Sequence, residues 1–137
     1  MKNLEIYVVA AILIKDGRIL CTRRKRDPRE WLSLKYEFPG GKIEAGETPR
    51  QALIREIREE LNLDVAVGEH FLTITHPYPD FLLHMETYLC ACEDYGAMRL
   101  SAHEDCRWVL PQEISGLDWV PADRPILDKI RREYING

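Results

Sequence analysis

The segment spanning residues 41–63 constrains this chain more than any other, because its spacing predicts a helix with defined ends. Thr48 suits the N-cap and Pro49 the first helical turn, and helix-favouring residues fill the positions up to Leu61. Asn62 follows, and asparagine tolerates the left-handed conformation that often ends a helix. The sequence therefore predicts a helix that begins at Thr48 and ends at Leu61.

Three glutamates share one face of this predicted helix. On a helix that turns by about 100° per residue, Glu59 lies about 60° to one side of Glu56, and Glu60 about 40° to the other. Like charges at this spacing destabilise a helix unless something neutralises them. Carboxylate oxygens are the ligands that Mg²⁺ and Mn²⁺ prefer. The pattern favours a metal site, and the alternative is a solvated acidic face paired with Arg55 and Arg58.

The rest of the chain shows the patterns of a layered domain. The predicted strands cover residues 4–14, 19–22, 63–67, 71–75, 81–92 and 107–110, with a short extended piece at 36–41. A helical turn is expected at 111–114 and a second helix at 123–134, with loops at 23–27 and 101–107. The residues expected to pack the first helix against the sheet are Leu53, Ile54, Ile57 and Leu61. Strands mixed with two unlike helices indicate an α+β or α/β domain.

Composition narrows the class of protein further. A chain of 137 residues with 45% hydrophobic residues suits one domain, residues 1–137. The net charge of −4 gives no basic field for a nucleic-acid polymer, and no apolar run reaches the roughly 18–20 residues of a membrane span. The first residues lack a signal-peptide pattern, and the four cysteines form no CxxC pair, so we expect a cytoplasmic protein without membrane or nucleic-acid partners. The pattern does not predict an oligomeric state.

The loop and helix together resemble the Nudix box. The matching positions are Gly41, Glu47, Arg55, Glu56, Ile57, Glu59, Glu60 and Leu63. Only the last glycine of the motif is replaced, by Asn62, which accepts the same positive φ. Residues 22–24, 37–44 and 121–125 are similar to the MutT-type branch of that family. The resemblance implies an α/β class and a Nudix fold, which is an α/β/α sandwich around a mixed β-sheet.

The resemblance also implies a divalent-metal centre. Its ligands would be the carbonyl oxygen of Gly40 and the carboxylates of Glu56, Glu59 and Glu60, and they would hold Mg²⁺ or Mn²⁺. Glycine suits the first of these positions, because the backbone must come close to the metal and the phosphates. Arg55 would orient the glutamates through charge-assisted hydrogen bonds, with Glu47 as its partner.

A further acid would complete the catalytic group. In the MutT branch a loop glutamate before the late strand reaches the metals, and here the candidate is Glu104, with Asp105 as the alternative. A carboxylate near the attacking water would act as its general base. A solvent-exposed loop acid is the competing interpretation for both residues.

The substrate-binding candidates also follow from the resemblance. They are Arg24, Glu37, Phe38, Gly40 and Asp123. Arg24 would contact phosphate, with Arg23 as the alternative, because adjacent residues of a strand face opposite ways. Leu4, Ile6 and Phe38 fall where the family builds the walls of a base pocket, although core packing would equally explain them. Trp119 would either stack on the base or pack against the last helix.

Asp123 bears on the choice of base. It aligns with an asparagine that reads an oxidised guanine in MutT, and an ionised carboxylate only accepts hydrogen bonds. A carboxylate would favour a base edge that shows donors, such as the amine of cytosine or the amine and ring N–H of a guanine. The alternative role is that of a helix N-cap before Pro125.

The resemblance therefore implies a Mg²⁺-dependent pyrophosphohydrolase that acts on nucleoside triphosphates, such as 8-oxo-dGTP or (d)CTP derivatives. The products would be the nucleoside monophosphate and pyrophosphate. Two alternatives remain open: a Nudix hydrolase of another nucleoside diphosphate derivative, such as a dinucleoside polyphosphate or nucleotide sugar, and a Nudix domain that binds nucleotide without cleaving it.

Overall fold

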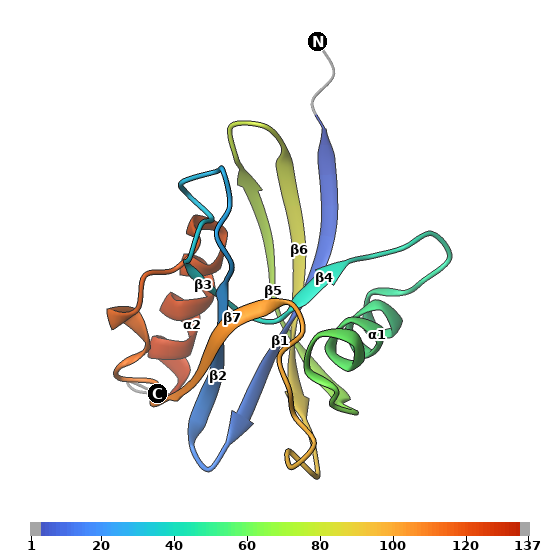
Figure 1. The fold of residues 1–137 in the computed structure, drawn as a ribbon, viewed down its shortest axis with the longest axis vertical. Coiled ribbons are helices and arrows are strands. Elements are labelled where there is room, and N and C mark those ends of the chain that lie inside the picture. The colour runs from blue at the N-terminus through green and yellow to red at the C-terminus, as the bar shows by residue number, and fades with distance from the viewer. Residues whose placement is uncertain (1–3, 135–137) are drawn as a thin grey trace.

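A mixed sheet lies between two helices in the computed structural model, which describes residues 4–134 (Figure 1). The elements are β1 (Glu5–Lys15), β2 (Arg18–Arg24), β3 (Tyr36–Glu37), β4 (Gly40–Lys42), α1 (Pro49–Leu61), β5 (Ala66–Pro77), β6 (Leu82–Ala91), β7 (His103–Val109), two 3₁₀ turns (Ile114–Gly116 and Pro121–Asp123) and α2 (Arg124–Tyr134). Within residues 4–134, no helix has the length and apolarity that crossing a membrane requires.

β1 is the central strand of the sheet. It runs parallel to β6, whereas β2 and β4 pair with it in the antiparallel sense. The outer strands are antiparallel to their neighbours, β5 to β6 and both β3 and β7 to β2. One parallel pair among antiparallel neighbours makes the sheet mixed. This arrangement, with a helix on each side, confirms the predicted α/β sandwich.

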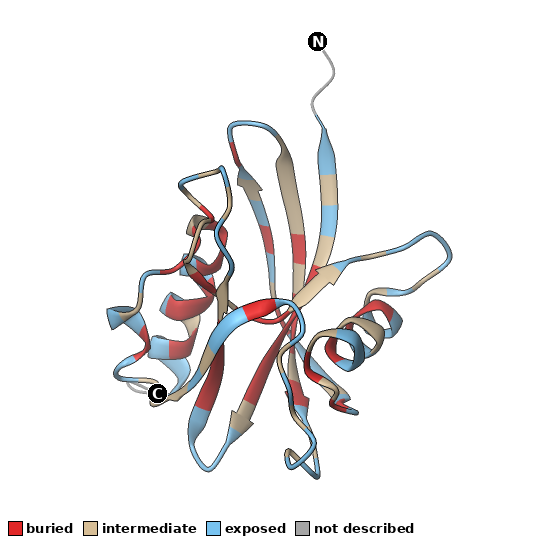
Figure 2. Cartoon of the chain, in the orientation of Figure 1, coloured by how far each residue is buried: buried red, intermediate tan, exposed pale blue. Residues whose placement is uncertain are grey.

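Both faces of β1 are buried, which explains its continuous apolar run. Ala10 and Ile12 belong to the core under α2, whereas Val9, Ala11 and Leu13 belong to the core under α1. In Figure 2 the buried positions lie on the central strands and on both helices, while the outer loops are mostly exposed. The sheet therefore joins two separate apolar cores.

The ends of α1 follow the sequence prediction. The side chain of Thr48 accepts a hydrogen bond from the backbone N–H of Gln51, and the Gln51 side chain accepts one from the backbone of Thr48. Asn62 ends the helix in the left-handed conformation, with φ of 57°. The buried residues of the helix are Ala52, Leu53, Ile57 and Leu61. The expected anchor Ile54 is wrong, because it is 45% exposed and lies about 100° around the helix from Leu53.

Several predicted boundaries are wrong, and hydrogen bonding to β6 and β2 explains the two that concern strands. β5 is one strand over Ala66–Pro77 rather than two, and it stays paired with β6 across register shifts near His70. β7 begins at His103, inside the predicted loop, because it pairs with β2 along its length. The helical turn lies at Ile114–Gly116 rather than at 111–114.

Candidate active site

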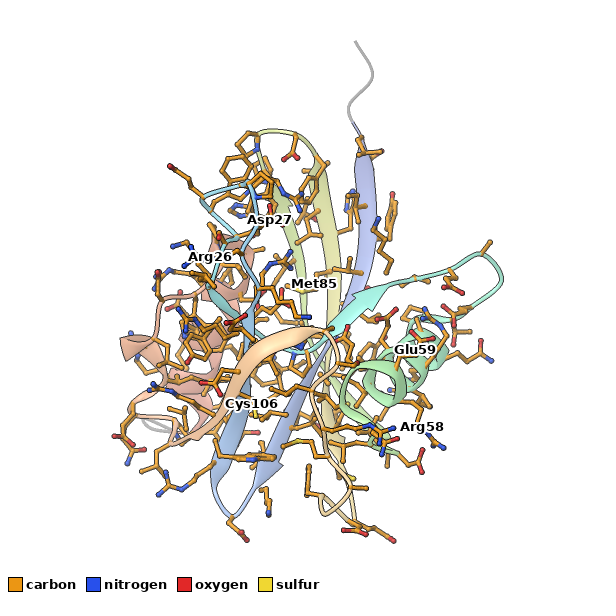
Figure 3. All side chains as sticks on the ribbon, viewed as in Figure 1. Arg26, Asp27, Arg58, Glu59, Met85 and Cys106 are labelled. Carbon is orange, nitrogen blue, oxygen red and sulfur yellow. The ribbon has the colours of Figure 1, made fainter. Side chains whose placement is uncertain are left out.

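A cleft of about 450 Å³ opens beside the acidic face of α1. Its apolar lining includes Ile6, Val8, Phe38, Tyr78, Phe81, Leu83 and Met85, and its polar lining includes Arg24, Glu37, Glu60, His103 and Asp123. In Figure 3, Met85 lies between the loop that carries Arg26 and Asp27 and the helix that carries Glu59. The expected wall residues Ile6 and Phe38 do line the cleft, whereas Leu4 is exposed and does not belong to its lining.

Arg55 holds in place carboxylates of α1 and of the loop before it, which do not belong to the cleft lining. Its guanidinium donates to Glu47 and to Glu56, each at 2.7 Å, and to Glu59 at 3.3 Å. It also donates to the carbonyl oxygen of Lys42 at 3.0 Å, which ties the helix to β4. The hydrogen bonds that Arg55 donates to Glu47 lower the pKa of that glutamate to about 2. The hydrogen bonds to Glu47 and to Glu56 in turn raise the pKa of Arg55. These contacts are the ones expected of an orienting arginine.

The two glycines of β4 are required by close packing. A Cβ atom on Gly40 would lie 1.9 Å from the carbonyl oxygen of Val9 in β1. A Cβ atom on Gly41 would lie 2.2 Å from Oε2 of Glu56. The first glycine therefore lets β4 pair with β1, which is a reason that the sequence interpretation did not contain. The second leaves room for a carboxylate of the acidic face.

Glu60 has the least solvated carboxylate of the acidic face. Its side chain is only 13% exposed, and its Oε1 atom has no hydrogen-bond partner among the described residues. Burial, the adjacent carboxyl group of Glu56 and the charge of Glu37 raise the pKa of Glu60 to about 9, against the opposing effect of the Gly40 backbone. A buried carboxylate oxygen without a partner is a group that a bound cation would satisfy.

The donor set fits a hard divalent cation. Glu56, Glu59 and Glu60 project from one side of α1, and all three offer oxygen ligands, as Mg²⁺ and Mn²⁺ prefer. In residues 4–134, no three acidic, histidine or cysteine side chains already stand in coordinating positions around one point. The reason is visible in the contacts of Arg55, which engages two of these glutamates. A cation would have to draw them from this arginine toward Glu60.

A β-bulge decides which residue of β7 reaches the cleft. Arg23 pairs with Asp105, but Arg24 pairs with His103, so Glu104 is an extra residue in this strand. In a regular ladder Glu104 would stand opposite Arg24 and face the cleft with it. The bulge gives that place to His103 and leaves Glu104 exposed and outside the cleft lining. The predicted loop position of Glu104 is therefore wrong, while its catalytic role stays a prediction.

Arg24 and Arg23 are separated by the alternation of β2. Arg24 lines the cleft, donates from Nη1 to Glu37 at 2.9 Å, and has a buried Nε atom without a partner among the described residues. Arg23 points elsewhere and donates from Nε to the carbonyl oxygen of Leu34 at 2.9 Å. Of the two arginines, only Arg24 is placed to meet a ligand in the cleft.

Glu37 and Glu60 have His103 between them. The Nε2 atom of His103 lies 3.0 Å from Oε2 of Glu37, and its Nδ1 atom lies 4.0 Å from Oε1 of Glu60. The histidine side chain is 3% exposed. Sequence reasoning missed this residue, since no ligand spacing marks it and nothing in the sequence locates the bulge that turns it inward.

Asp123 accepts its hydrogen bond from across the cleft. Its Oδ2 atom receives the backbone N–H of Phe38 at 2.9 Å, and the residue is 4% exposed. Among the described residues, this contact replaces the N-cap bond that the helix interpretation expected. Burial raises the pKa of Asp123 to about 8; the charge of Glu37 adds to the shift, and the N–H of Phe38 opposes it. A protonated carboxyl group donates as well as accepts, so the raised pKa opposes the expected acceptor-only side chain.

Trp119 belongs to the core rather than to the cleft lining. Its indole ring packs on Phe38 with ring centres 4.7 Å apart and donates from Nε1 to the carbonyl oxygen of Ile114 at 2.8 Å. The residue is fully buried. It supports the back of Phe38, so the stacking surface that a base could meet is supplied by other side chains.

The family model described as the NUDIX domain matches residues 8–129, so the chain belongs to the Nudix hydrolase family, whose members act on pyrophosphate bonds and generally use divalent metals. The CTP pyrophosphohydrolase of Escherichia coli strain K12 is 34% identical over 128 residues, covering 93% of this chain and 91% of that protein. The putative 8-oxo-dGTP diphosphatase 2 of Mycobacterium tuberculosis is 38% identical, over 98% of this chain and 93% of that protein. The solution structure of the E. coli ORF135 protein superposes with a TM-score of 0.80 at 32% identity, over 98% and 96% of the two chains.

Proposed function

We propose that this protein is a Mg²⁺-dependent pyrophosphohydrolase that converts nucleoside triphosphates, including oxidised or modified ones, to the nucleoside monophosphate and pyrophosphate. The observation that carries the proposal is the unpartnered, buried Oε1 atom of Glu60 beside Glu56 in the wall of a cleft that also contains Arg24. Such a site combines carboxylate oxygens that suit a cation with a guanidinium that suits phosphate. The two named relatives, a CTP pyrophosphohydrolase and a putative 8-oxo-dGTP diphosphatase, support this substrate class.

The residues that would hold the cation are Glu56, Glu59, Glu60 and the carbonyl oxygen of Gly40. When bound, Mg²⁺ or Mn²⁺ neutralises charge on the diphosphate and makes water more acidic. Arg55 keeps Glu56 and Glu59 directed to one side of α1 through the hydrogen bonds described above.

The remaining polar residues would bind the substrate and take up a proton. Arg24 donates to phosphate oxygens from its unpartnered Nε atom while Glu37 fixes the guanidinium. Glu104 is the proposed proton acceptor, with Asp105 as the alternative, and Glu104 must turn from the outer side of the bulge to act.

Asp123 would bind the base together with Phe38. With Oδ2 engaged by the Phe38 N–H, the Oδ1 atom is the one that faces a ligand. In its protonated form this atom donates a hydrogen bond, and in its ionised form it accepts one. A neutral Asp123 therefore fits a base edge with an acceptor, which both cytosine N3 and the O6 of an oxidised guanine provide.

A panel of triphosphates assayed with Mg²⁺ tests the proposal. We expect release of pyrophosphate from CTP, dCTP, 8-oxo-dGTP and the unmodified nucleotides at different kcat/KM. Dinucleoside polyphosphates and nucleotide sugars serve as the competing substrates. Faster turnover of these competitors would assign another diphosphate substrate, orthophosphate as the product would refute the bond assignment, and nucleotide binding without turnover would indicate a non-catalytic domain.

A further inference from the structure

His103 is a buried polar residue of the cleft lining, with a side chain that is 3% exposed. It is held on one side by Glu37, which itself binds Arg24. On its other side stands Glu60. The histidine therefore links the part of the cleft that carries the phosphate-binding arginine to the acidic face of α1.

The contact with Glu60 is incomplete in this structure. The Nδ1 atom of His103 and the Oε1 atom of Glu60 are 4.0 Å apart, about 1 Å more than a hydrogen bond between nitrogen and oxygen. Neither atom has another partner among the described residues, and both are shielded from solvent. Because the imidazole ring is rigid and Nε2 is fixed by Glu37, the direction of Nδ1 toward Glu60 is fixed as well. Two facing buried polar atoms without partners indicate a contact that forms in another state of the site.

The backbone supports the same interpretation. The bulge at Glu104 is what brings His103 opposite Arg24 instead of the acid that follows it. Bulges beside active sites commonly re-aim a side chain. A purely structural residue at this place would need no hydrogen-bonding groups on both edges, since an apolar side chain would fill the space without unpartnered atoms.

We propose that His103 is a positioning residue that holds Glu37 and Glu60 at a fixed separation and closes its hydrogen bond with Glu60 when the acidic face takes up its cation. His103 then makes one rigid unit of the Arg24–Glu37 pair, which would bind phosphate, and the carboxylate of Glu60, which would bind the cation. The inference deepens the proposed function and rests on it for the role of the site, although its central claim concerns only the geometry of Glu60.

Substitutions at His103 test this with two readouts, Mn²⁺ binding followed by electron paramagnetic resonance without substrate, and steady-state hydrolysis with Mg²⁺. We expect His103→Ala to weaken Mn²⁺ binding and to lower kcat by about 10–100-fold, as is usual for partners of metal ligands. The KM for the triphosphate should change less than kcat. His70→Ala is the matched control, because His70 also contacts a glutamate, Glu86 at 2.9 Å, but both of these side chains are exposed to solvent and lie outside the cleft lining.

Two conservative variants separate a bridge from a simple hydrogen bond. Glutamine places its amide nitrogen near the position of Nε2 and restores the contact with Glu37, whereas asparagine reaches only the position of Nδ1. If His103 bridges the two glutamates, we expect His103→Gln and His103→Asn each to recover part of the Mn²⁺ binding and kcat that His103→Ala loses. Full recovery of Mn²⁺ binding and kcat by His103→Gln would overturn the proposal, because the Glu37 contact alone would then suffice.

The outcomes also distinguish this inference from the proposed function. If the wild-type protein binds Mn²⁺ but hydrolyses no triphosphate, the proposed function fails and the binding series still tests His103. Unchanged Mn²⁺ binding in His103→Ala, in a protein with a wild-type thermal unfolding midpoint, refutes the inference whatever the substrate proves to be. If the alanine variant does not fold, the glutamine and asparagine variants, which keep a polar group in the cavity, decide the question.

Discussion

Glu60 is largely buried beside other carboxyl groups. Replacing it with glutamine should therefore affect the free energy of unfolding and kcat in different ways. Without a cation, burial and the neighbouring carboxyl groups raise its pKa and so favour the protonated form, which resembles an amide. We expect Glu60→Gln to leave the free energy of unfolding in chelator unchanged or slightly higher, and to lower kcat by orders of magnitude because an amide is a poor Mg²⁺ ligand. Chemical denaturation and steady-state assays measure both quantities.

Glu59→Gln is the companion variant, since Glu59 is exposed and bound to Arg55 rather than buried. It should also lower kcat strongly while the fold stays intact. Near-normal turnover in either variant would mean that the cation is held by other groups.

Asp123 gives the second prediction at the residue scale, which concerns stability against pH. Its pKa is about 8 in the folded protein and 3.8 is the ordinary value, so the folded state holds an extra proton between these limits. The contribution of Asp123 to the free energy of unfolding is therefore full below about pH 4, and it is lost as the pH rises through 8. We expect the thermal unfolding midpoint of the wild type to fall more between pH 6 and pH 9 than that of Asp123→Asn, which has no titrating group there.

The same variant reports on the base. The amide of Asp123→Asn, with its oxygen on the Phe38 N–H, presents a permanent donor to the cleft, like the protonated acid. Base preference in kcat/KM should then match the wild type near pH 7 and diverge from it above pH 8. If both proteins show the same preference at every pH, Asp123 does not read the base.

At the scale of elements, β4 offers a matched pair of substitutions. Gly40→Ala places Cβ against the backbone of Val9 in β1, and we expect a loss of about 1–3 kcal/mol in the free energy of unfolding, as is typical for overpacking. Gly41→Ala instead places Cβ against the movable carboxylate of Glu56. Its stability should be nearly unchanged, and kcat should fall by about 100-fold through displacement of that group.

Thermal unfolding and kcat measured on both variants check this contrast. A Gly41→Ala enzyme of normal kcat would show that the place of Glu56 beside β4 is unimportant for turnover. Equal destabilisation of the two variants would contradict the assignment of separate roles to the two glycines.

The elements also show what a sequence can and cannot reveal. The helix α1 was predictable because its cap, its proline and its terminal asparagine are local signals within a few residues of one another. The bulge in β7 was not predictable, because it exists only through pairing with β2, a strand far away in the sequence. Glu56, Glu59 and Glu60 were accordingly proposed from the helix pattern and Arg24 from the family resemblance, whereas His103 was proposed only from the structure. The raised pKa of Asp123 escaped sequence reasoning for the same reason, since burial is a property of the assembled cleft.

For the whole molecule, the cation should act on stability as well as on turnover. A ligand that binds only the folded state raises the free energy of unfolding by about 2.7 kcal/mol at a concentration about 100 times its Kd. We expect Mg²⁺ to raise the thermal unfolding midpoint of the wild type but not of Glu60→Gln, and excess chelator to abolish hydrolysis. Full activity in excess chelator would refute the metal dependence.

The parallel pairing of β1 with β6 has a consequence for how the chain reaches this state. Residues Glu5–Leu13 pair with Leu82–Cys90, which lie more than half of the chain's length further on. Closing so large a loop costs entropy before any contact repays it, and such non-local pairing slows folding. During synthesis β1 leaves the ribosome long before its partner, so α1 has no completed sheet to dock on until β6 has emerged. The acidic face is therefore assembled late, only after most of the polypeptide has been made.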